Sequence, residues 1–300
     1  MIVLYRLFSQ LPFAVLYGFA NVLYFIAYYV VRYRRKVVRK NLSHAFPELN
    51  QTELGKLEKR FYRNFSNMLL EVVKAYTMPV EELEKRFTFD NYEELQQYLD
   101  KQQSVLLLGV HQGNWEWMIQ AISNRASCPV DGVYKPLHGE NGDKIFYHTR
   151  SRFGMCLVAF DDAMRRVIKG RKEFRIFSMM ADQAPISREK RYWKTFLNRP
   201  APFYYGPQLI AEVTQYPVVY AKVHKRKKGH YHVCFKTIAA PPHQRSSVDI
   251  LNNYICAIED AIREQPETFL WSNKKWRSPK KGELDKQAEE LAEKALKAKS

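Results

Sequence analysis

The sequence predicts an α/β fold with a mostly parallel central sheet flanked by helices. Between residues 104 and 180, short apolar segments of strand length alternate with longer segments of helical periodicity. Strands that alternate with helices in this way are typical of a largely parallel sheet. Two later strand-like segments, 218–224 and 231–237, are joined by a Lys-rich turn that ends in Gly229. They predict an antiparallel hairpin in the same sheet.

The composition predicts that the chain folds and that it binds negatively charged partners. Its 300 residues are 46% hydrophobic, which is enough for one substantial core or two smaller ones. The 48 Lys and Arg residues outnumber the 31 Asp and Glu residues, so the formal net charge is +17. This charge would attract phospholipid surfaces, phosphorylated glycolipids, acidic carrier proteins or nucleic acid.

Residues 1–31 predict an N-terminal membrane-anchoring helix. No charged residue occurs from Leu7 to Val31, and a helix of this length, about 37 Å, can cross a hydrocarbon core of ~30 Å with some tilt. Residues 32–40 contain six basic residues and no acid, so the positive-inside rule places the rest of the chain in the cytoplasm. A cleaved signal peptide is disfavoured, because the apolar segment is long and basic residues follow it. Two alternatives stay open, a helix in the membrane interface and a buried core helix, because Pro12 and Gly18 disfavour a continuous membrane-spanning helix.

Beyond this anchor we expect three further parts of the chain. Residues 32–103 form a basic juxtamembrane segment with amphipathic helices, residues 104–278 form the α/β core, and residues 279–300 form a charged tail. The tail consists mostly of Lys, Glu and Ala and has little apolar surface to bury. We therefore expect a solvated helix or a frayed end there.

Capping signals and periodicity predict the individual elements. Asn50 with Glu53 three residues later forms a capping box, and it begins one long amphipathic helix that continues to Tyr76. Asp90 with Glu93 repeats this signal before a shorter helix. In the core we expect strands at residues 105–110, 130–134, 156–160 and 174–180, a basic loop after the last of these, and helices that begin at Asn114, end at Phe153 and Ile168, and cover residues 205–213.

His111 and Glu116 are the catalytic pair that the sequence predicts. His111 follows a buried strand, and in open α/β sheets the carboxyl ends of strands gather catalytic groups. An imidazole with an ordinary pKa of ~6.5 suits a general base that deprotonates an alcohol. If the turn folds back, Glu116 can accept the other ring N–H and stabilise the imidazolium. Backbone N–H groups around Gly113 and Asn114 are candidate donors to an oxyanion. On spacing alone, a surface His and a Glu favoured by the helix dipole stay an alternative.

Other chemistries have little support. The sequence lacks a Walker A motif, a G-x-S-x-G elbow and an H-E-x-x-H sequence. The four cysteines lie far apart without a CxxC pair, so neither a disulfide framework nor a zinc ribbon is indicated. His230, His232 and Cys234 alternate on one face of a strand, but zinc usually needs four ligands at recognisable spacing, and we expect no metal. Basic and aromatic residues interleave over 188–203, yet no nucleic-acid module is recognised, and an anionic lipid explains the charge better.

Several separate blocks resemble the bacterial lipid A biosynthesis lauroyl/myristoyl acyltransferases. This is a branch of the lysophospholipid-acyltransferase-like families, in which four residues separate a His from an Asp or Glu. The resemblance runs from the N-terminal segment almost to Arg277. The similar blocks are Asn41–Leu42 with Ala45–Glu48, His111–Glu116, Val133–Leu137, Arg150–Gly154, Ala181–Gln183, Phe196–Ala201 and Pro266–Trp276. The chain departs from the family pattern at Lys135, where Arg is usual, at Asn273, where His is usual, and at Lys274–Lys275, where Arg-Arg is usual.

The resemblance implies transfer of a fatty acyl chain from acyl carrier protein to a hydroxyl of a phosphorylated lipid A precursor. It places this reaction at the cytoplasmic face of the inner membrane, and we expect direct attack without a metal, a cofactor or a covalent intermediate. The resemblance carries over His111 and Glu116 as catalytic residues. Arg150 and Arg152 would bind phosphate or steer the acceptor, because guanidinium suits bidentate phosphate contacts; a solvated or ion-paired helix face is the alternative. The other expected substrate-binding residues are Lys135, Asp182, Gln183, Gly113, Asn114, Trp271 and Trp276.

Some of these expectations have alternatives of equal standing. Asp182 and Gln183 could hydrogen-bond around the site or simply cap a loop, and Trp271 and Trp276 could line the cleft, sit at the membrane interface or pack in the core. Two other functions also stay open. One is an acyltransferase for another membrane lipid, such as an aminolipid or a glycosylated phospholipid, with acyl-CoA as an alternative donor. The other is a non-catalytic, membrane-tethered protein that binds anionic lipid or nucleic acid by charge.

Overall fold

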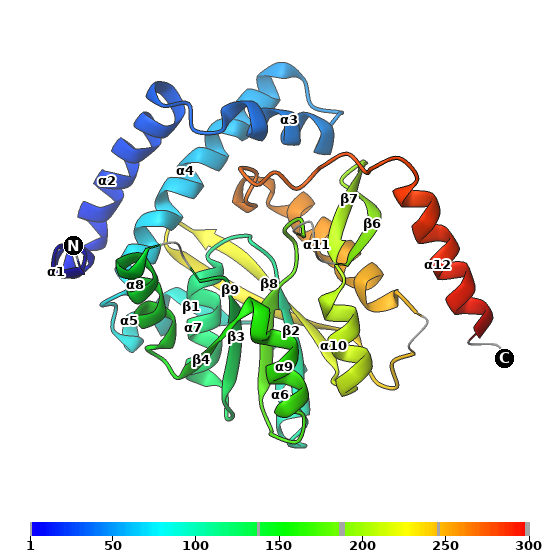
Figure 1. Ribbon diagram of the computed structural model, residues 1–300. Helices are drawn as coiled ribbons and strands as arrows, with labels where there is room; N and C mark the ends of the chain where they lie inside the picture. The colour runs from blue at the N-terminus through cyan, green and yellow to red at the C-terminus, as the bar shows by residue number, and fades with distance from the viewer. Residues whose placement is uncertain (1, 137–138, 186–189, 245–246, 298–300) are drawn as a thin grey trace.

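A seven-stranded sheet in the order β1-β9-β8-β2-β5-β3-β4 forms the centre of the molecule (Figure 1). The computed structural model describes residues 2–136, 139–185, 190–244 and 247–297, so Leu137 and residues 188–189 of the blocks above and the last three residues of the tail lie outside the described residues. The strands of this sheet are β1 (Phe87–Phe89), β2 (Val105–Gly109), β3 (Val130–Tyr134), β4 (Met155–Ala159), β5 (Ile176–Met180), β8 (Val218–Lys227) and β9 (His230–Ala239).

The sheet is mostly parallel. Strands β8, β2, β5, β3 and β4 run in one direction, β9 is antiparallel to β8, and β1 is parallel to β9. Both the parallel sheet and the β8–β9 hairpin agree with the sequence-based prediction. The central strand β2 is buried along its whole length, as expected for a parallel strand with helices on both faces.

Helices cover both faces of the sheet, and the sheet separates two hydrophobic cores. Alternation along β2 directs Leu106 and Leu108 into one core with α10 and α11, and Val105 and Leu107 into the other with α6 and α7. The helices are α1 (Ile2–Gln10), α2 (Phe13–Phe25), the π-helix η1 (Ile26–Val30), α3 (Arg35–Ala45), α4 (Gln51–Ala75), α5 (Val80–Arg86), α6 (Glu93–Leu99), α7 (Trp115–Arg125), α8 (Glu140–Ser151), the 3-10 helix η2 (Phe160–Asp162), α9 (Ala163–Lys169), α10 (Gly206–Thr214), α11 (Asp249–Glu264), the 3-10 helix η3 (Pro266–Thr268) and α12 (Glu283–Lys297).

The long helix α4 begins with the predicted capping box. The Asn50 side chain accepts from the backbone N–H groups of Thr52 and Glu53, and the Glu53 carboxylate accepts the N–H of Asn50. The second predicted cap is wrong: α6 begins at Glu93 without a side-chain cap, because the Asp90 carboxylate instead pairs with Arg226 on β8 at 2.7 Å.

The N-terminal apolar segment is not one continuous helix. It divides at Leu11–Pro12 into α1 and α2, because proline lacks the N–H that would continue the helical ladder. In the described part of the chain, one helical stretch, Phe13–Val30, is long and apolar enough to cross a membrane by length and composition. This stretch packs along α4 (Figure 1).

The sequence-based prediction missed several elements. The expected basic loop contains a two-stranded antiparallel sheet, β6 (Arg191–Phe196) and β7 (Arg199–Tyr204). The amphipathic helix α11, which covers one face of the main sheet, and the short α5 and β1 were also absent from the prediction. The charged tail forms α12, and it is docked rather than free, since Gln287 exchanges two hydrogen bonds with the backbone of Trp193.

Candidate active site

His111 and Asp182 meet at the carboxyl ends of two neighbouring parallel strands. Gly109 on β2 stands opposite Met180 on β5, so the residues two positions beyond them emerge at the same edge of the sheet. The Asp182 carboxylate lies 2.7 Å from His111 Nδ1 and accepts the backbone N–H of His111 at 3.2 Å. The fold thus joins two side chains that are 71 positions apart in the sequence.

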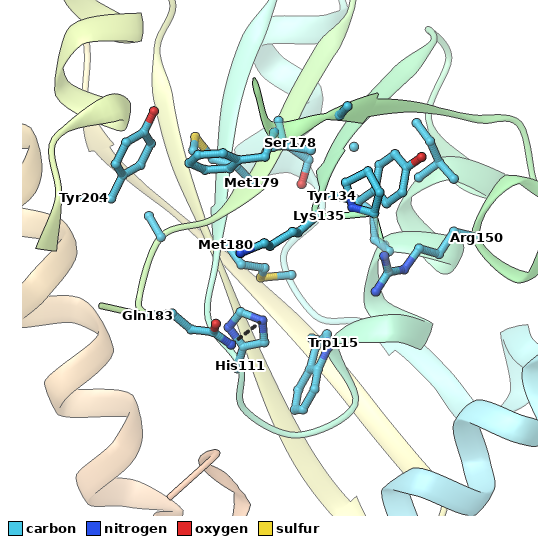
Figure 2. A pocket seen from close by; sticks show the side chains of 18 of the residues that line it. His111, Trp115, Tyr134, Lys135, Arg150, Ser178, Met179, Met180, Gln183 and Tyr204 are labelled. Carbon is cyan, nitrogen blue, oxygen red and sulfur yellow. Dashed lines mark hydrogen bonds between the residues drawn. The ribbon is translucent and has the colours of Figure 1, made fainter. Parts of the chain in front are cut away.

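This contact determines which imidazole nitrogen is available for catalysis. An ionised carboxylate can only accept, so Nδ1 carries the proton that it donates to Asp182, and Nε2 carries the lone pair. The Gln183 side-chain amide donates to this lone pair at 3.2 Å, and the two side chains face each other in Figure 2. His111 is therefore held in the tautomer that a general base needs.

The same contact shifts both pKa values. Burial opposes protonation of His111, but the adjacent Asp182 carboxylate outweighs burial, so the pKa of His111 is raised above its ordinary 6.5. Burial also favours the neutral form of Asp182, but His111, with help from Lys275, holds the pKa of this carboxyl below its ordinary 3.8. Each partner stabilises the charged form of the other.

Glu116 has a different partner from the one predicted. Its carboxylate accepts two hydrogen bonds from Arg150, from Nε at 2.8 Å and from Nη2 at 2.5 Å, and one from the Trp115 indole at 3.2 Å. The turn does not fold back, because α7 begins immediately after its N-cap Asn114 and directs Glu116 toward α8. The expectation that Glu116 accepts the ring N–H of His111 is therefore corrected, since Asp182 accepts it.

His111 lines a pocket of about 620 Å³. Side chains from both faces of the sheet line the pocket. Met155 and Met180 belong to the core on the α7 side, and Val133 and Met179 belong to the core on the α10 side. Both parts are largely apolar. The polar lining residues are His111, Glu116, Lys135, Arg150, Asp161, Ser178 and Gln183. Such a pocket suits a substrate with long apolar chains and a charged head.

Of the expected oxyanion donors, the backbone N–H of Gly113 already has a partner, and Asn114 is held by its side chain. The Gly113 N–H donates to the Thr268 carbonyl at 3.0 Å. Asn114 is fully buried, and its side chain accepts the Trp117 N–H at the start of α7 and donates to Glu71 at 2.9 Å. Neither residue lines the pocket, so both shape the segment that carries His111 rather than contact a ligand.

Four other expected substrate-binding residues lie outside the pocket lining. Asp182 is one of them, because its carboxylate pairs with His111. Arg152 donates to the carbonyls of Ala75 and Met78, the latter at 3.0 Å, because the helix α8 directs it toward the end of α4. Trp271 is fully buried and donates to the Pro266 carbonyl at 2.6 Å. Trp276 donates to a backbone carbonyl of β6 at 3.0 Å and stacks on Trp271. Of the alternatives left open by the sequence, packing within the protein describes both tryptophans.

Glu71 is a buried residue of the site region that the sequence analysis missed. It is 1% exposed and accepts hydrogen bonds from Asn114 at 2.9 Å, from Tyr231 at 2.7 Å and from Tyr17 at 3.0 Å. The signal was present in the sequence, because Glu71 falls among the apolar positions of α4. This carboxylate ties the start of α7 to α4, β9 and α2.

Lys275 was also unexpected as a buried cation. It is 1% exposed, donates to the Pro202 carbonyl at 2.6 Å and lies 3.3 Å from the centre of the Phe203 ring. Burial lowers its pKa well below the ordinary 10.5, and the Asp182 carboxylate opposes this shift. Lys275 therefore lies close enough to Asp182 for each charge to affect the other.

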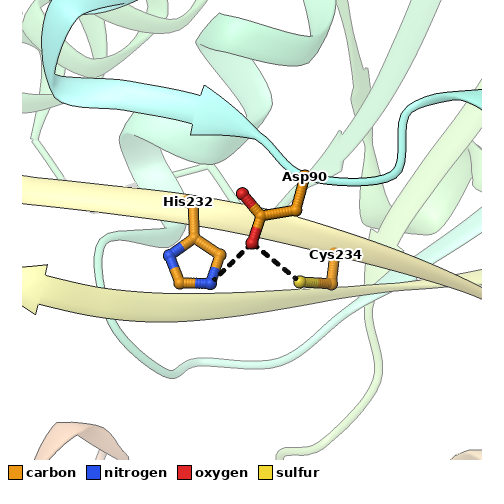
Figure 3. Close-up of side chains that lie close together, drawn as sticks. All are labelled: Asp90, His232 and Cys234. Atoms are coloured by element: carbon orange, nitrogen blue, oxygen red, sulfur yellow. Dashed lines mark hydrogen bonds and ion pairs between the residues drawn. The ribbon is translucent and has the colours of Figure 1, made fainter.

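A cluster of possible metal ligands lies on the β8–β9 hairpin, away from the pocket. Asp90, His232 and Cys234 place one ligand atom each within 4.8 Å of the others (Figure 3); of the sequence-derived trio, His230 is not among them. Arg226 donates to His232 Nδ1 at 3.0 Å, so the ring proton lies on Nε2, which donates to Asp90 at 3.1 Å. A metal at Nε2 needs the opposite tautomer, and the cluster is therefore a closed polar network.

The fold thus places a histidine–carboxylate pair beside a largely apolar pocket that also contains cationic side chains. The chain matches the family described as bacterial lipid A biosynthesis acyltransferase over residues 1–278. It therefore belongs to this family of acyltransferases. A curated relative, the lipid A biosynthesis lauroyltransferase of Escherichia coli (strain K12), is 22% identical over 278 residues, which cover 91% of this chain and 89% of the relative. The resemblance inferred from the separate sequence blocks is confirmed.

Proposed function

We propose that the chain transfers a fatty acyl group from an acyl thioester to a hydroxyl of a phosphorylated lipid A precursor, with His111 as general base. The observation that carries this proposal is the 2.7 Å contact between His111 Nδ1 and Asp182, which leaves the lone pair on Nε2 beside an apolar pocket. A substrate hydroxyl would replace the Gln183 amide that donates to Nε2 in the structure. Membership of the lipid A acyltransferase family supports the reaction class.

The reaction follows from the geometry of the pair. His111 Nε2 takes the proton of the acceptor hydroxyl as its oxygen attacks the thioester carbon, so a C–O bond forms. Asp182 stabilises the imidazolium that results. When the tetrahedral intermediate collapses, the C–S bond breaks and His111 returns the proton to the leaving thiolate. Donor and acceptor must therefore occupy the pocket together.

Glu116 acts in this scheme through Arg150. By holding Nε and Nη2 of the guanidinium, Glu116 fixes its plane and presents Nη1 to a ligand. Arg150 and Lys135 both line the pocket, and we assign them to a phosphate or to the negative charge that develops on the thioester oxygen. Glu116 is thus essential as a positioning residue, while His111 contacts the reacting atoms.

The apolar part of the pocket on the α7 side receives the acyl chain. Its wall includes Ile119, Gly132, Met155 and Met180, and a Cβ at Gly132 would lie 2.3 Å from the Met155 sulfur. Met155 therefore occupies the space that the glycine leaves. Because thioether side chains adapt to irregular apolar surfaces, we assign this pair to the end wall that limits the fatty chain.

We further propose that acyl carrier protein is the donor and that the reaction takes place at the cytoplasmic face of the inner membrane. The net charge of +17 suits an acidic carrier and an anionic lipid surface, and the stretch Phe13–Val30 is apolar enough to associate with a membrane. Acyl-CoA is the alternative donor, and a direct comparison of the two thioesters decides between them.

The test is an acyl-transfer assay with the purified full chain. Acyl carrier protein or coenzyme A loaded with one defined fatty acid is mixed with a phosphorylated lipid A precursor, and mass spectrometry monitors the addition of one acyl group. We expect transfer by the native chain and none by His111→Ala. His230→Ala is the matched control, because His230 lies on the distant β8–β9 hairpin, and it should retain activity. Transfer by His111→Ala at the native rate contradicts the proposed base.

Lys135 favours a second acceptor class that the same assay should include. It lines the pocket at a position where the resembling family usually has Arg. Lys offers a point charge whereas Arg offers a planar fork that matches phosphate oxygens. An aminolipid or a glycosylated phospholipid is therefore tested beside the lipid A precursor, and the preferred acceptor is the one with the higher kcat/KM.

A further inference from the structure

The N-terminal helices carry an exposed apolar surface that the proposed reaction does not use. We propose that this surface embeds in an anionic phospholipid bilayer with α2 lying along the membrane plane, rather than crossing it. The inference rests on the proposed membrane location, and it goes further by specifying how the chain is held there.

The outer face of α2 and η1 is apolar and exposed. Phe19, Val22 and Phe25 are 47%, 56% and 57% exposed, and α1 adds Val3 and Leu4 at 70% and 72%. Surfaces of this kind mark contacts with membranes or proteins. In Figure 1, α1 and α2 lie at the outer side of α4, away from the sheet.

The inner face of the same helices is attached to charged residues of the body. Tyr17 donates to the buried Glu71 at 3.0 Å, and Lys74 Nζ donates to the Leu11 carbonyl at the break between α1 and α2, at 2.9 Å. The Arg86 guanidinium lies 3.6 Å from the centre of the Phe13 ring. The beginning of α2 is thus attached by polar as well as apolar contacts.

The end of the helical stretch is attached in the same manner. Arg63 on α4 lies 5.1 Å from the centre of the Tyr24 ring, and Arg35 on α3 lies 4.2 Å from the centre of the Tyr28 ring. Leu16 and Ala20, which lie between Phe13 and Tyr24, are 1% exposed and pack with Leu70 of α4. Cationic side chains therefore lie along the inner face of the stretch Phe13–Val30 from its beginning to its end.

These contacts conflict with a membrane-crossing helix. If α2 crossed the bilayer and kept them, Arg86, Glu71 and Arg63 would enter the hydrocarbon, where charged groups are expensive. If α2 crossed alone, all of these hydrogen bonds and ring contacts would be lost. The stretch Phe13–Val30 also measures only about 27 Å at ~1.5 Å per residue, slightly less than the hydrocarbon core of ~30 Å.

The charge around the apolar face identifies an anionic bilayer as its occupant. Arg32, Lys36 and Lys40 are exposed directly after η1, and no acid occurs from residue 32 to 40. An amphipathic helix with an apolar outer face and adjacent cations binds anionic lipid surfaces in the interfacial plane. A second copy of this chain would bring two such basic segments together, which charge repulsion opposes.

The orientation is tested by the accessibility of the N-terminus in the full chain. A peptide tag is placed before Met1 behind a cleavage site for a specific protease, and the same tag after Ser300 is the cytoplasmic reference. With α2 in the membrane plane, both tags are cleaved in inverted inner-membrane vesicles and neither in intact spheroplasts. Cleavage of the N-terminal tag in spheroplasts, with the C-terminal tag protected, overturns the inference but leaves the membrane location intact.

The lipid contact is tested by flotation with vesicles that contain phosphatidylglycerol. Val22→Asp or Phe25→Asp should weaken binding by about tenfold or more, whereas Leu209→Asp, at an exposed position on the distant α10, should not. Circular dichroism verifies folding of each variant. If the native chain fails to bind the vesicles, the membrane location itself is overturned; if it binds and the two α2 variants bind equally well, the assigned surface is wrong.

Discussion

Replacement of Asp182 by Asn tests the central contact of the site. The substitution keeps the size of the side chain and one acceptor oxygen but removes the negative charge opposite His111 Nδ1. Asp182 currently receives both the ring N–H at 2.7 Å and the backbone N–H of His111 at 3.2 Å. We expect the fold to persist, because Asn can still accept these bonds, while the imidazolium that forms during attack loses its counter-charge.

The expected loss follows from the strength of a charge-assisted hydrogen bond. Such bonds contribute about 1.5–3 kcal/mol, and this contribution is greatest when the ring is charged in the transition state. The corresponding decrease in kcat is about 10-fold to 150-fold. If the amide also rotates so that its NH2 group faces Nδ1, the ring adopts the wrong tautomer and the loss is larger.

The pH dependence of kcat/KM distinguishes a catalytic effect from general damage. His111 acts as a base only when neutral, so the rate falls as pH decreases through its pKa, which Asp182 raises above 6.5. In Asp182→Asn the raising charge is gone while burial, which lowers the pKa, stays. The acidic limb of the profile should therefore move to lower pH.

Glu116→Gln provides the matched comparison, because it removes the other carboxylate. Glu116 raises the pKa of His111 less than Asp182 does, and Glu116 pairs with Arg150 rather than with the ring, so this variant should shift the acidic limb less than Asp182→Asn. Its effect should appear mainly in the KM of the acceptor. The reverse result, with the larger shift in Glu116→Gln, would refute the assignment of Asp182 as partner of His111.

Three further outcomes follow from the surroundings of the site. Gly113→Ala should destabilise the fold by about 1–3 kcal/mol, since the residue has φ +62° and a new Cβ would lie 2.7 Å from Val223; thermal unfolding measures this, and Val223→Ala in the same chain should recover part of the loss. Tyr17→Phe removes one of three donors to buried Glu71, and should lower stability by about 1–3 kcal/mol, measured by urea unfolding; an unchanged midpoint contradicts the role of this bond. Met155→Ala should shift the preferred acyl chain to longer lengths, by about fourfold in kcat/KM per added methylene, in competition assays with mixed donors.

The position of His111 was predictable from local sequence, and its partner was not. The apolar strand, the glycine and the following helix signal all lie within residues 105–116, so they place His111 at a strand end without further information. Asp182 reaches His111 only because β5 pairs with β2, and strand order is a property of the whole chain. The nearest carboxylate in the sequence was therefore chosen instead of the nearest one in space.

Tertiary contacts also explain the other differences. The N–H of Gly113 was expected to be free because helix starts leave donors unpaired, but Thr268, more than 150 residues away, accepts it. Arg152 and Trp276 belong to blocks that resemble the family, yet their hydrogen bonds join distant segments of the backbone. A resemblance in sequence locates such residues without distinguishing those that contact a ligand from those that support the site.

The two carboxylates of the site act differently because their neighbours differ. Asp182 is buried beside a titratable imidazole, and its charge favours a proton on His111. Glu116 faces a guanidinium that stays protonated, and in the proposed mechanism it orients Arg150. If Glu116 paired with His111 instead, Arg150 would lose its carboxylate partner and would attract Asp182 away from the base. In the proposed mechanism, one pair serves proton transfer and the other binds an anion, and their separation allows a histidine base to act beside a phosphorylated substrate.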